Sequence, residues 1–354
     1  MIKKFAFFLP QFHEIKENNE WWGKGFTEWV NVKKSKPIYK NHKQPKEPLD
    51  GYYNLLEKKT VEHQTELMKK YNMDGMIYYH YYFMGKKLLE KPAENLLKWT
   101  DIEQPFFFCW ANHSWIKSWE GTSEMLVEQK YGTEVDWEKH FEYLLPFFKD
   151  KRYEKKDNKP LFMIFNSIFD EKKDIISFFD KKCKENGFDG IYIINSCFTP
   201  NDYNKNCAEQ YNVSCSYFLR EPNYSTELYI NFCRRVIRKI KKFIISKNSK
   251  SKIILKYDGN KLLNLAINKM VKNDKVIHGL FFEWDNTPRH SKRGYIINPI
   301  SKETFFNYMD KIKDEEYVFI NAWNEWAEGM MLEGTKENGY KYLEWIKEFS
   351  DREV

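Results

Sequence analysis

Two glutamates three residues apart, Glu325 and Glu328, are the residues of this sequence best suited to acid–base chemistry. If the segment turns helically, both side chains lie on one face, with Cβ atoms about 5–6 Å apart. Two carboxyl groups this close do not ionise independently, so we expect the pKa of one to rise. One carboxyl group can then donate a proton while the other accepts one. We interpret the pair as candidate catalytic residues.

Two tryptophans and two asparagines flank the pair: Asn321, Trp323, Asn324 and Trp326. A flat indole can cover the apolar face of a sugar ring, and an amide can bind its hydroxyl groups. The spacing Glu-x-x-Glu alone is also common at the exposed start of a helix. Here the apolar run Val318–Ile320 directly precedes the segment and predicts a buried strand. The combination favours a sugar-binding active site over an exposed helix start.

Short apolar runs that alternate with helix-length segments predict the elements that position this site. Buried strands in such alternation are typical of parallel β–α units. We expect one (β/α)8 TIM-type barrel, a single catalytic domain over residues 1–354, in which Lys252–Tyr257 is not a barrel strand. A doubly wound open sheet is the alternative, but the sequence has no G-x-G-x-x-G, P-loop or D-x-D motif. The other predicted strands are Phe5–Leu9, Met76–Tyr81, Phe106–Ala111, Leu161–Phe165, Ile191–Asn195, Asn212–Tyr217, Gly279–Phe282 and Val318–Ile320.

Polar and aromatic residues follow most of the predicted strands, and in a barrel the carboxyl ends of the strands meet at one rim, where active sites lie. We expect a long first loop, residues 18–53, to cover this rim. For His13 and His80 a structural hydrogen bond is an equally good explanation. Asp285, Asn286 and Arg289 could bind substrate, or Asp285 could form an ion pair with Arg289 that braces the rim, and for Arg289 this structural role is favoured. The candidate substrate-binding residues are Gln11, His13, Tyr79, His80, Trp110, Asn112, Trp115, Trp284, Asp285, Asn286, Asn321, Trp323, Asn324 and Trp326. One pocket is expected to gather the two glutamates with Gln11, His80, Trp110, Asn112, Trp284 and Asn321.

Composition narrows the class of protein. The charges are interleaved, with 58 Lys and Arg against 51 Asp and Glu, which is typical of a solvated surface and not of a nucleic-acid-binding one. Six cysteines without a C-x-x-C pair indicate free thiols, and without an H-E-x-x-H motif we expect no metal and no cofactor. The N-terminal residues lack the features of a signal peptide, and no apolar run reaches the 18 residues of a membrane span. We therefore expect a cytoplasmic protein.

A basic segment, residues 228–257, contains ten lysines or arginines and no acid. Within it, Val236, Ile240, Phe243 and Ile244 would share one face of a helix. An outer helix of the barrel, with this apolar face packed on the sheet, is the favoured interpretation. A basic amphipathic helix around 234–247 that rests on the inner membrane is the alternative. The sequence predicts no oligomeric state.

The motifs at the predicted rim resemble those of the WbsX family. These are proteins of bacterial surface-polysaccharide (O-antigen, capsule) gene clusters, also described as glycoside-hydrolase-family-99-like domains. The resemblance extends from Phe5 to about Leu343. After Asn112 and after Glu333 the sequence departs from the usual family pattern, which affects the expected substrate. The segments that carry the resemblance are Phe8–His13, Trp22–Trp29, Tyr79–Tyr81, Leu88–Pro92, Cys109–Asn112, Glu128–Tyr131, Trp284–Arg289 and Trp323–Gly329.

The last of these segments is also similar to the catalytic segment of the family 99 endo-α-mannosidases, which are retaining (β/α)8 enzymes. The resemblance implies that Glu325 deprotonates the 2-hydroxyl of the sugar, which attacks its own anomeric carbon, and that Glu328 protonates the leaving oxygen. It implies a mannose-like α-glycan, free or lipid-linked, as substrate. Two other classes stay open: a glycosyltransferase of O-antigen or capsule biosynthesis, and a non-catalytic glycan-binding barrel.

Overall fold

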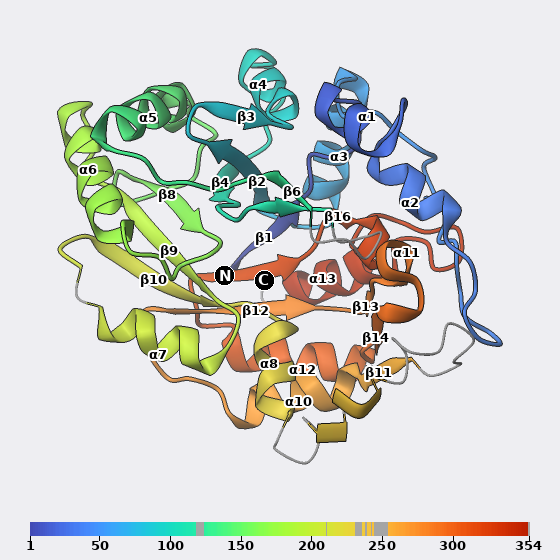
Figure 1. Cartoon of the computed structure of the whole chain (residues 1–354). Coiled ribbons are helices and arrows are strands. Elements are labelled where there is room, and N and C mark those ends of the chain that lie inside the picture. The colour runs from blue at the N-terminus through green and yellow to red at the C-terminus, as the bar shows by residue number, and fades with distance from the viewer. Residues whose placement is uncertain are drawn as a thin grey trace.

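The computed structural model describes residues 1–117, 124–209, 211–230, 236–237, 239–241, 243 and 254–352. Eight parallel strands form a closed barrel (Figure 1), because the first strand pairs with both the second and the last. Nearly every residue of these strands is buried, as expected for strands covered on both faces. The predicted (β/α)8 fold is confirmed. The barrel strands are β1 (Lys3–Phe8), β2 (Gly75–Phe83), β4 (Phe106–Trp110), β8 (Lys159–Ile164), β9 (Tyr192–Cys197), β10 (Ser214–Leu219), β12 (Val276–Phe281) and β15 (Tyr317–Asn321).

Amphipathic helices surround the barrel (Figure 1). Their apolar residues face the strands; in the helix before β15, for example, Phe305, Met309 and Ile312 are buried. Two of the helices begin with a capping box, at Thr133 and at Thr199, where side chains satisfy the first backbone N–H groups. The outer helices are α3 (Lys58–Lys70), α4 (Lys91–Lys98), α5 (Glu134–Lys149), α6 (Lys172–Glu185), α7 (Pro200–Ala208), α8 (Asn223–Tyr229), α10 (Gly259–Asn268), α12 (Lys302–Ile312) and α13 (Lys341–Arg352).

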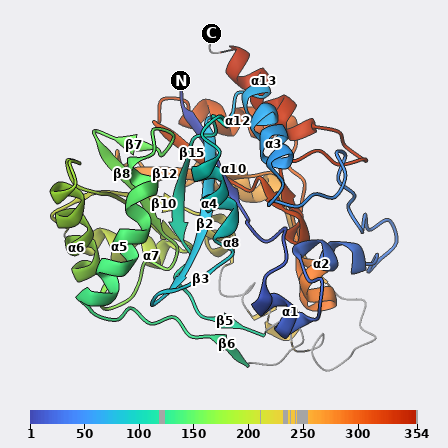
Figure 2. The ribbon, with the colours of Figure 1, turned by 90° about the horizontal axis from the view of Figure 1, so that it is seen from above.

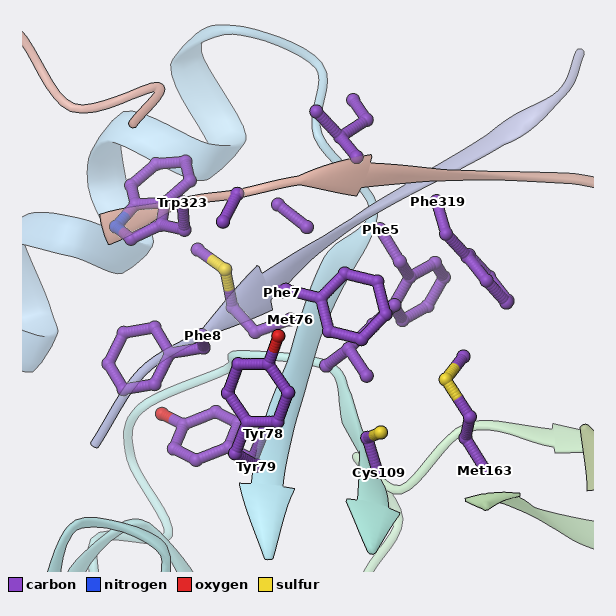
Figure 3. Close-up of a cluster of buried hydrophobic side chains, with 14 of the residues drawn as sticks. Phe5, Phe7, Phe8, Met76, Tyr78, Tyr79, Cys109, Met163, Phe319 and Trp323 are labelled. Carbon is purple, nitrogen blue, oxygen red and sulfur yellow. The ribbon is translucent and has the colours of Figure 1, made fainter. Parts of the chain in front are cut away.

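Aromatic side chains fill the interior of the barrel. Phe5, Phe7 and Phe319 point into this core (Figure 3), and the ring centroids of Phe7 lie 5.4 Å from Tyr79 and 5.6 Å from Phe218. Burial of each such side chain stabilises the fold by roughly 1.5–3 kcal/mol. The packed interior gives the rim above it a rigid base.

A small second sheet lies beside the barrel. Its strand β11 (Leu255–Asp258) pairs with β14 (Tyr295–Asn298), which in turn pairs with β13 (Trp284–Asp285). The described part of Lys252–Tyr257 is therefore outside the barrel, as predicted. Two short helical segments, α11 (Thr287–His290) and η1 (Ser291–Arg293), connect β13 to β14.

The first loop is partly helical. It contains α1 (Lys16–Trp22) and α2 (Glu28–Lys34), and α2 packs against α11 and against η2 (Trp326–Glu328). Figure 2 shows α1 and α2 at one end of the barrel, together with the hairpin of β5 (Trp115–Ile116) and β6 (Met125–Val127). This is the end at which the strands finish, so the loop lies over the rim as predicted. The remaining short strands are β3 (Lys86–Leu88), β7 (Lys155–Lys156), β16 (Asn324–Glu325) and β17 (Met330–Met331).

The described residues of the predicted apolar face in the basic segment do not pack on the sheet. Val236, Ile240 and Phe243 are 41%, 53% and 63% exposed, and Ile244 lies outside the described residues. The favoured interpretation, an outer helix with a buried apolar face, is therefore wrong for these three residues. Contact with a membrane stays a prediction.

Three further properties bear on the compartment and on metals. The five described cysteines are free, and all but Cys207 are buried. Among the described residues, no helix combines the length and the apolar character needed to span a bilayer. No cluster of three or more potential metal ligands occurs in the described ranges. The cytoplasmic location stays a prediction.

Candidate active site

A cavity of about 490 Å³ lies at the carboxyl ends of the barrel strands. Each of the eight strands, or the segment directly after it, contributes at least one residue to its wall. This arrangement is that of active sites in (β/α)8 enzymes. The lining residues are Leu9, Gln11, Trp22, Tyr79, Tyr81, His113, Ser114, Trp115, Ile116, Leu126, Phe165, Phe198, Arg220, Asn223, Trp284, Arg289, Glu325, Glu328 and Met330.

The two glutamates enter this cavity from one short turn. After β15 the chain forms β16, which contains Glu325, and then the 3₁₀ turn η2, which ends at Glu328. Side chains three residues apart nearly eclipse one another in such a turn. Gly329 then adopts a φ of 60°, and the chain returns through β17, which pairs with β16. The predicted common face for the two carboxyl groups is thus produced by a single tight turn.

The guanidinium of Arg289 on α11 contacts three carboxylates. It forms ion pairs with Glu328 and, at 3.3 Å between Nη2 and Oε2, with Glu325. Its Nη2 and Nε also lie 2.6 and 2.8 Å from Oε1 of Glu28, a completely buried residue of α2. Burial raises the pKa of Glu28, while the charge of Arg289 lowers it. Arg289 therefore joins the first loop of the chain to its last barrel strand.

Glu325 has an unusual pKa. Burial raises it to about 7, the charge of Arg289 opposes this rise, and the charges of Glu328 and Glu28 add to it. The rise of one pKa is as predicted, although its largest cause is burial and not repulsion within the pair. A carboxyl group with such a pKa can exchange protons with a substrate near neutral pH.

Aromatic side chains line the cavity around the acids. The indole N–H of Trp284 donates to Oε2 of Glu328 at 2.9 Å. Trp22 of α1 and Trp115 of β5 lie in the wall formed by the loops, and Trp115 packs on the edge of Tyr81 at 5.1 Å. The predicted residues that line the cavity are Gln11, Tyr79, Trp115, Trp284, Glu325 and Glu328.

His80, Trp110 and Asn112 do not line the cavity, contrary to the prediction. Successive side chains of a strand point to opposite faces, and His80 and Trp110 point outward to α5. His80 is within 2.8 Å of His140, and burial lowers its pKa to about 3, while the indole of Trp110 donates to the carbonyl of Tyr82. Asn112 hydrogen-bonds the backbone N–H and C=O of residue 166, which ties two rim loops together.

The residues that flank Glu325 and Glu328 brace their turn instead of lining the cavity. Asn321 donates to the carbonyl of Glu221, and the side chain of Asn324 bonds both the N–H and the C=O of Leu9. The indoles of Trp323 and Trp326 donate to the buried carboxylate of Glu333, at 3.1 and 2.6 Å. None of these four residues lines the cavity, so the expected place of Asn321 in the pocket is wrong, whereas substrate binding by the four stays a prediction.

Asp285, Asn286 and His13 also lie outside the cavity. Asp285 accepts hydrogen bonds from His42, Gln44 and Thr287, so the predicted alternative of an ion pair with Arg289 is wrong. Asn286 accepts from the backbone N–H of residue 295. His13 is 1% exposed, and neither ring nitrogen has a hydrogen-bond partner among the described residues. Burial lowers its pKa to about 4.

Three charged residues that matter here were not among the predicted site residues: Arg220, Glu28 and Glu333. Arg220 directly follows β10, so the rule that found the other rim residues applies to it. Glu28 lies in a segment that carried the family resemblance. Glu333 had no signal in the sequence, since its role depends on two indoles that meet only in the fold.

Comparison with known sequences identifies relatives of the whole chain. A family model described as Glycosyltransferase WbsX matches residues 4–346. The uncharacterized protein WxcX of Xanthomonas campestris pv. campestris strain B100 is 28% identical over 355 residues, which cover 96% of this chain and 48% of that protein. WxcX of strain ATCC 33913 gives the same identity and coverage. The chain thus spans about half the length of the curated relatives it matches.

Solved structures share the fold. The GH99 endo-alpha-mannosidase of Bacteroides thetaiotaomicron in complex with bis-tris-propane has a TM-score of 0.56 at 12% identity, over 99% of this chain and 96% of that chain. A second structure of that enzyme has a TM-score of 0.54 at 13% identity, over all of both chains. A glycoside hydrolase-like protein has a TM-score of 0.58 at 12% identity, over 98% of this chain and 93% of that chain.

Proposed function

Because the chain belongs to the family described as Glycosyltransferase WbsX, we propose that it is an enzyme that cleaves or transfers glycosidic bonds, with Glu325 and Glu328 as its catalytic pair. The observation that carries the proposal is the placement of both carboxyl groups in one rim cavity, against a shared arginine. The fold shared with GH99 endo-alpha-mannosidases supports glycan chemistry. We propose a mannose-like α-glycan, free or lipid-linked, of bacterial surface-polysaccharide metabolism as the substrate.

In the proposed reaction, the carboxylate of Glu325 takes the proton of the sugar 2-hydroxyl. The 2-oxygen attacks the anomeric carbon, the bond from that carbon to the leaving oxygen breaks, and Glu328 gives its proton to the leaving oxygen. In the second half, Glu328 takes a proton from water or an acceptor hydroxyl, which attacks the anomeric carbon. The 1,2-anhydro bond then opens, and Glu325 returns its proton to the 2-oxygen. Two inversions give net retention.

The contacts of Arg289 support this proton exchange. Throughout the scheme, Glu325 and Glu328 share one proton and together carry one negative charge. Arg289 lies against both carboxyl groups, so it can stabilise this charge on whichever group is ionised. The raised pKa of Glu325 suits a base that operates near neutral pH.

Incubation of the purified protein with free and lipid-linked α-mannose oligosaccharides, each with and without nucleotide sugars, tests the proposal. We expect a new product with retained anomeric configuration, formed without a nucleotide sugar and without added metal. The proposal is contradicted if the intact protein forms no product. It is also contradicted if a variant in which both Glu325 and Glu328 are replaced forms the same product. The first of these outcomes favours the non-catalytic glycan-binding barrel.

Transfer from a nucleotide sugar is the second candidate, and the family description favours it. A diphosphate carries at least two negative charges, and no lysine is among the described residues that line the cavity. Of its two arginines, Arg289 is already paired with three carboxylates. We therefore expect weak binding of nucleotide sugars. Calorimetry that finds tight, magnesium-dependent binding would favour the glycosyltransferase over the hydrolase or transglycosylase.

A further inference from the structure

Arg220 is a buried arginine of the cavity wall that has no acidic partner among the described residues. It directly follows β10 and is only 6% exposed. Its Nη2 donates to the hydroxyl oxygen of Tyr79 at 2.5 Å. Its Nη1 has no hydrogen-bond partner, and no carboxylate of the described residues forms an ion pair with it. A buried guanidinium normally satisfies its N–H groups, because an unmet donor that is shielded from water costs free energy.

Aromatic rings surround the guanidinium of Arg220. Its central carbon lies 4.2 Å from the ring centroid of Phe7, 5.0 Å from that of Phe165 and 5.6 Å from that of Phe198. Ring faces attract a cation, but they supply no oxygen for the in-plane N–H groups. The rings hold the guanidinium in place, Nη1 is left as an unmet buried donor, and the residue lines the cavity.

Other arginines of the protein show how a buried guanidinium is otherwise satisfied. Arg152, also buried, bonds both oxygens of Asp150 and two backbone carbonyls. Arg289 bonds three carboxylates. Glu221, the neighbour of Arg220 in sequence, is buried, but its carboxyl group bonds Ser225 on α8. The missing partner of Arg220 is therefore not supplied by the described part of the chain.

We propose that Arg220 binds a carboxylate of the substrate, so that the enzyme acts on a glycan with a uronic acid or another sugar acid beside the catalytic pair. A planar carboxylate can accept two parallel N–H bonds from one guanidinium. A phosphate or diphosphate carries up to two or more negative charges, which one arginine matches only in part, and the described lining offers no further unpaired lysine or arginine. The inference rests on the proposed function in one respect, namely that the ligand is a glycan.

The carboxylate site is close to the catalytic pair. Arg220 and Glu325 line the same cavity, and the positive charge of Arg220 is one of the causes that lower the pKa of Glu325. A sugar acid held by Arg220 would thus occupy the space next to the reacting bond. Only a glycan with a sugar acid next to the reacting glycosidic bond would then be bound well.

Binding of small sugar acids tests the proposal without requiring turnover. Mannuronate, glucuronate and galacturonate are compared with mannose, glucose and galactose, and with the hexose 6-phosphates, by ligand-observed NMR and calorimetry. Hydrogen bonds to a charged group are worth about 1.5–3 kcal/mol. This range corresponds to a preference of about tenfold or more for at least one acid over its neutral sugar.

Two variants show whether the preference depends on the guanidinium. Arg220→Gln removes the charge and should reduce the preference to about twofold or less. Arg352→Gln removes an exposed arginine that lies outside the cavity, so the preference should persist. If Arg220→Gln does not fold, as judged by its thermal unfolding, Arg220→Met makes the same test with an apolar side chain of similar length.

The proposal is overturned if no sugar acid binds better than its neutral sugar, or if the preference survives in the variant without the charge. Tighter binding of a hexose 6-phosphate than of the acid would assign the site to phosphate and overturn the sugar-acid substrate. These results are separate from the test of the catalytic pair. A preference that depends on Arg220, in a protein that turns over no glycan, supports the carboxylate site while contradicting the proposed reaction.

Discussion

Two arginines line the same cavity and have opposite surroundings. Arg289 lies among three carboxylates, whereas Arg220 lies among aromatic rings with no carboxylate of the described residues paired to it. An arginine whose charge is fully matched by acids of the protein can organise those acids but has little capacity for a ligand. An arginine with an unmet donor has that capacity. In the proposed enzyme, Arg289 organises the acids and Arg220 selects the substrate.

The largest effect is expected at the acids that Arg289 organises. Glu325→Gln and Glu328→Gln keep size but prevent proton transfer, so each should lower the rate on the natural glycan by roughly 10²–10⁴-fold. Glu328→Gln should regain activity on a glycoside with a good leaving group, which needs little protonation, whereas Glu325→Gln should not. Steady-state rates with melting temperatures measure this. If Glu325→Gln is the variant rescued, the two roles are reversed.

A matched control for these variants is Glu337→Gln. Glu337 is exposed, pairs with Lys43 at 2.9 Å, and lies outside the cavity. Its variant should keep a normal rate on both substrates. Near-normal rates for all three variants, or losses that only follow unfolding, would show that the catalytic pair is wrong.

Removal of Arg289 should destabilise the fold. Arg289→Met leaves Glu28, which is completely buried, without its cation, and such a loss costs about 3–5 kcal/mol of unfolding free energy. The double variant with Glu28→Gln should recover part of this loss, because the uncompensated charge is then gone. Urea denaturation measures both. Arg352→Met, which removes a surface pair with Glu348, should cost less than about 1 kcal/mol.

If Arg289→Met were as stable as the wild type, the organising role assigned to Arg289 would be lost. If the double variant were no more stable than Arg289→Met, the loss would arise from packing and not from the charge of Glu28. Either result would remove one half of the comparison between the two arginines.

A smaller effect is expected on the pH dependence of the rate, which depends on the pKa of Glu325. Glu325 acts as a base only when ionised, so kcat/KM should fall as the pH falls through about 7. Arg220 lowers the pKa of Glu325, so Arg220→Gln should raise that pKa and move the acidic limb to higher pH. Arg352→Gln removes an exposed charge outside the cavity and should leave the limb in place. A limb that moves to lower pH in Arg220→Gln would contradict the proximity of the two groups.

The smallest effect is expected on the stability of Arg220 variants. A buried charge without an acidic partner contributes little to folding, and its replacement by an apolar residue of similar size is often neutral or stabilising. Arg220→Met should therefore change the unfolding free energy by less than about 1 kcal/mol, in contrast to Arg289→Met. Urea denaturation of the two methionine variants in parallel measures the difference. A loss as large as that of Arg289→Met would mean that Arg220 has a structural role.

The fold and the proximity of Glu325 and Glu328 could be predicted from the sequence, because both depend on local patterns. Alternating apolar runs predicted the barrel, and the spacing of the two glutamates predicted a shared face. Whether a given side chain of a strand points into the barrel or outward could not be predicted as well. A shift of one residue in a strand reverses the direction of every side chain, and so Tyr79 lines the cavity while His80 and Trp110 point away.

Arg220 was missed because the end of its strand was placed too early. The predicted strand over 212–217 ends two residues before β10 does, so Arg220 did not stand at a predicted strand end. The bracing by Glu333 of the turn that holds Glu325 and Glu328 depends on tertiary contacts over several segments, among them Tyr53 of the first loop and Gln64 of α3. No local pattern in the sequence reports such contacts.

The pairing of Glu28 with Arg289 makes the active site a property of the closed barrel. Glu28 belongs to the loop after the first strand, and Arg289, Glu325 and Glu328 belong to segments after the last two. During synthesis on the ribosome the first acid emerges some 260 residues ahead of its arginine, a separation that only the completed ring of strands bridges. A chain divided between β8 and β9 would place the two charges in different fragments. Recovered activity on mixing such fragments would therefore report barrel closure directly.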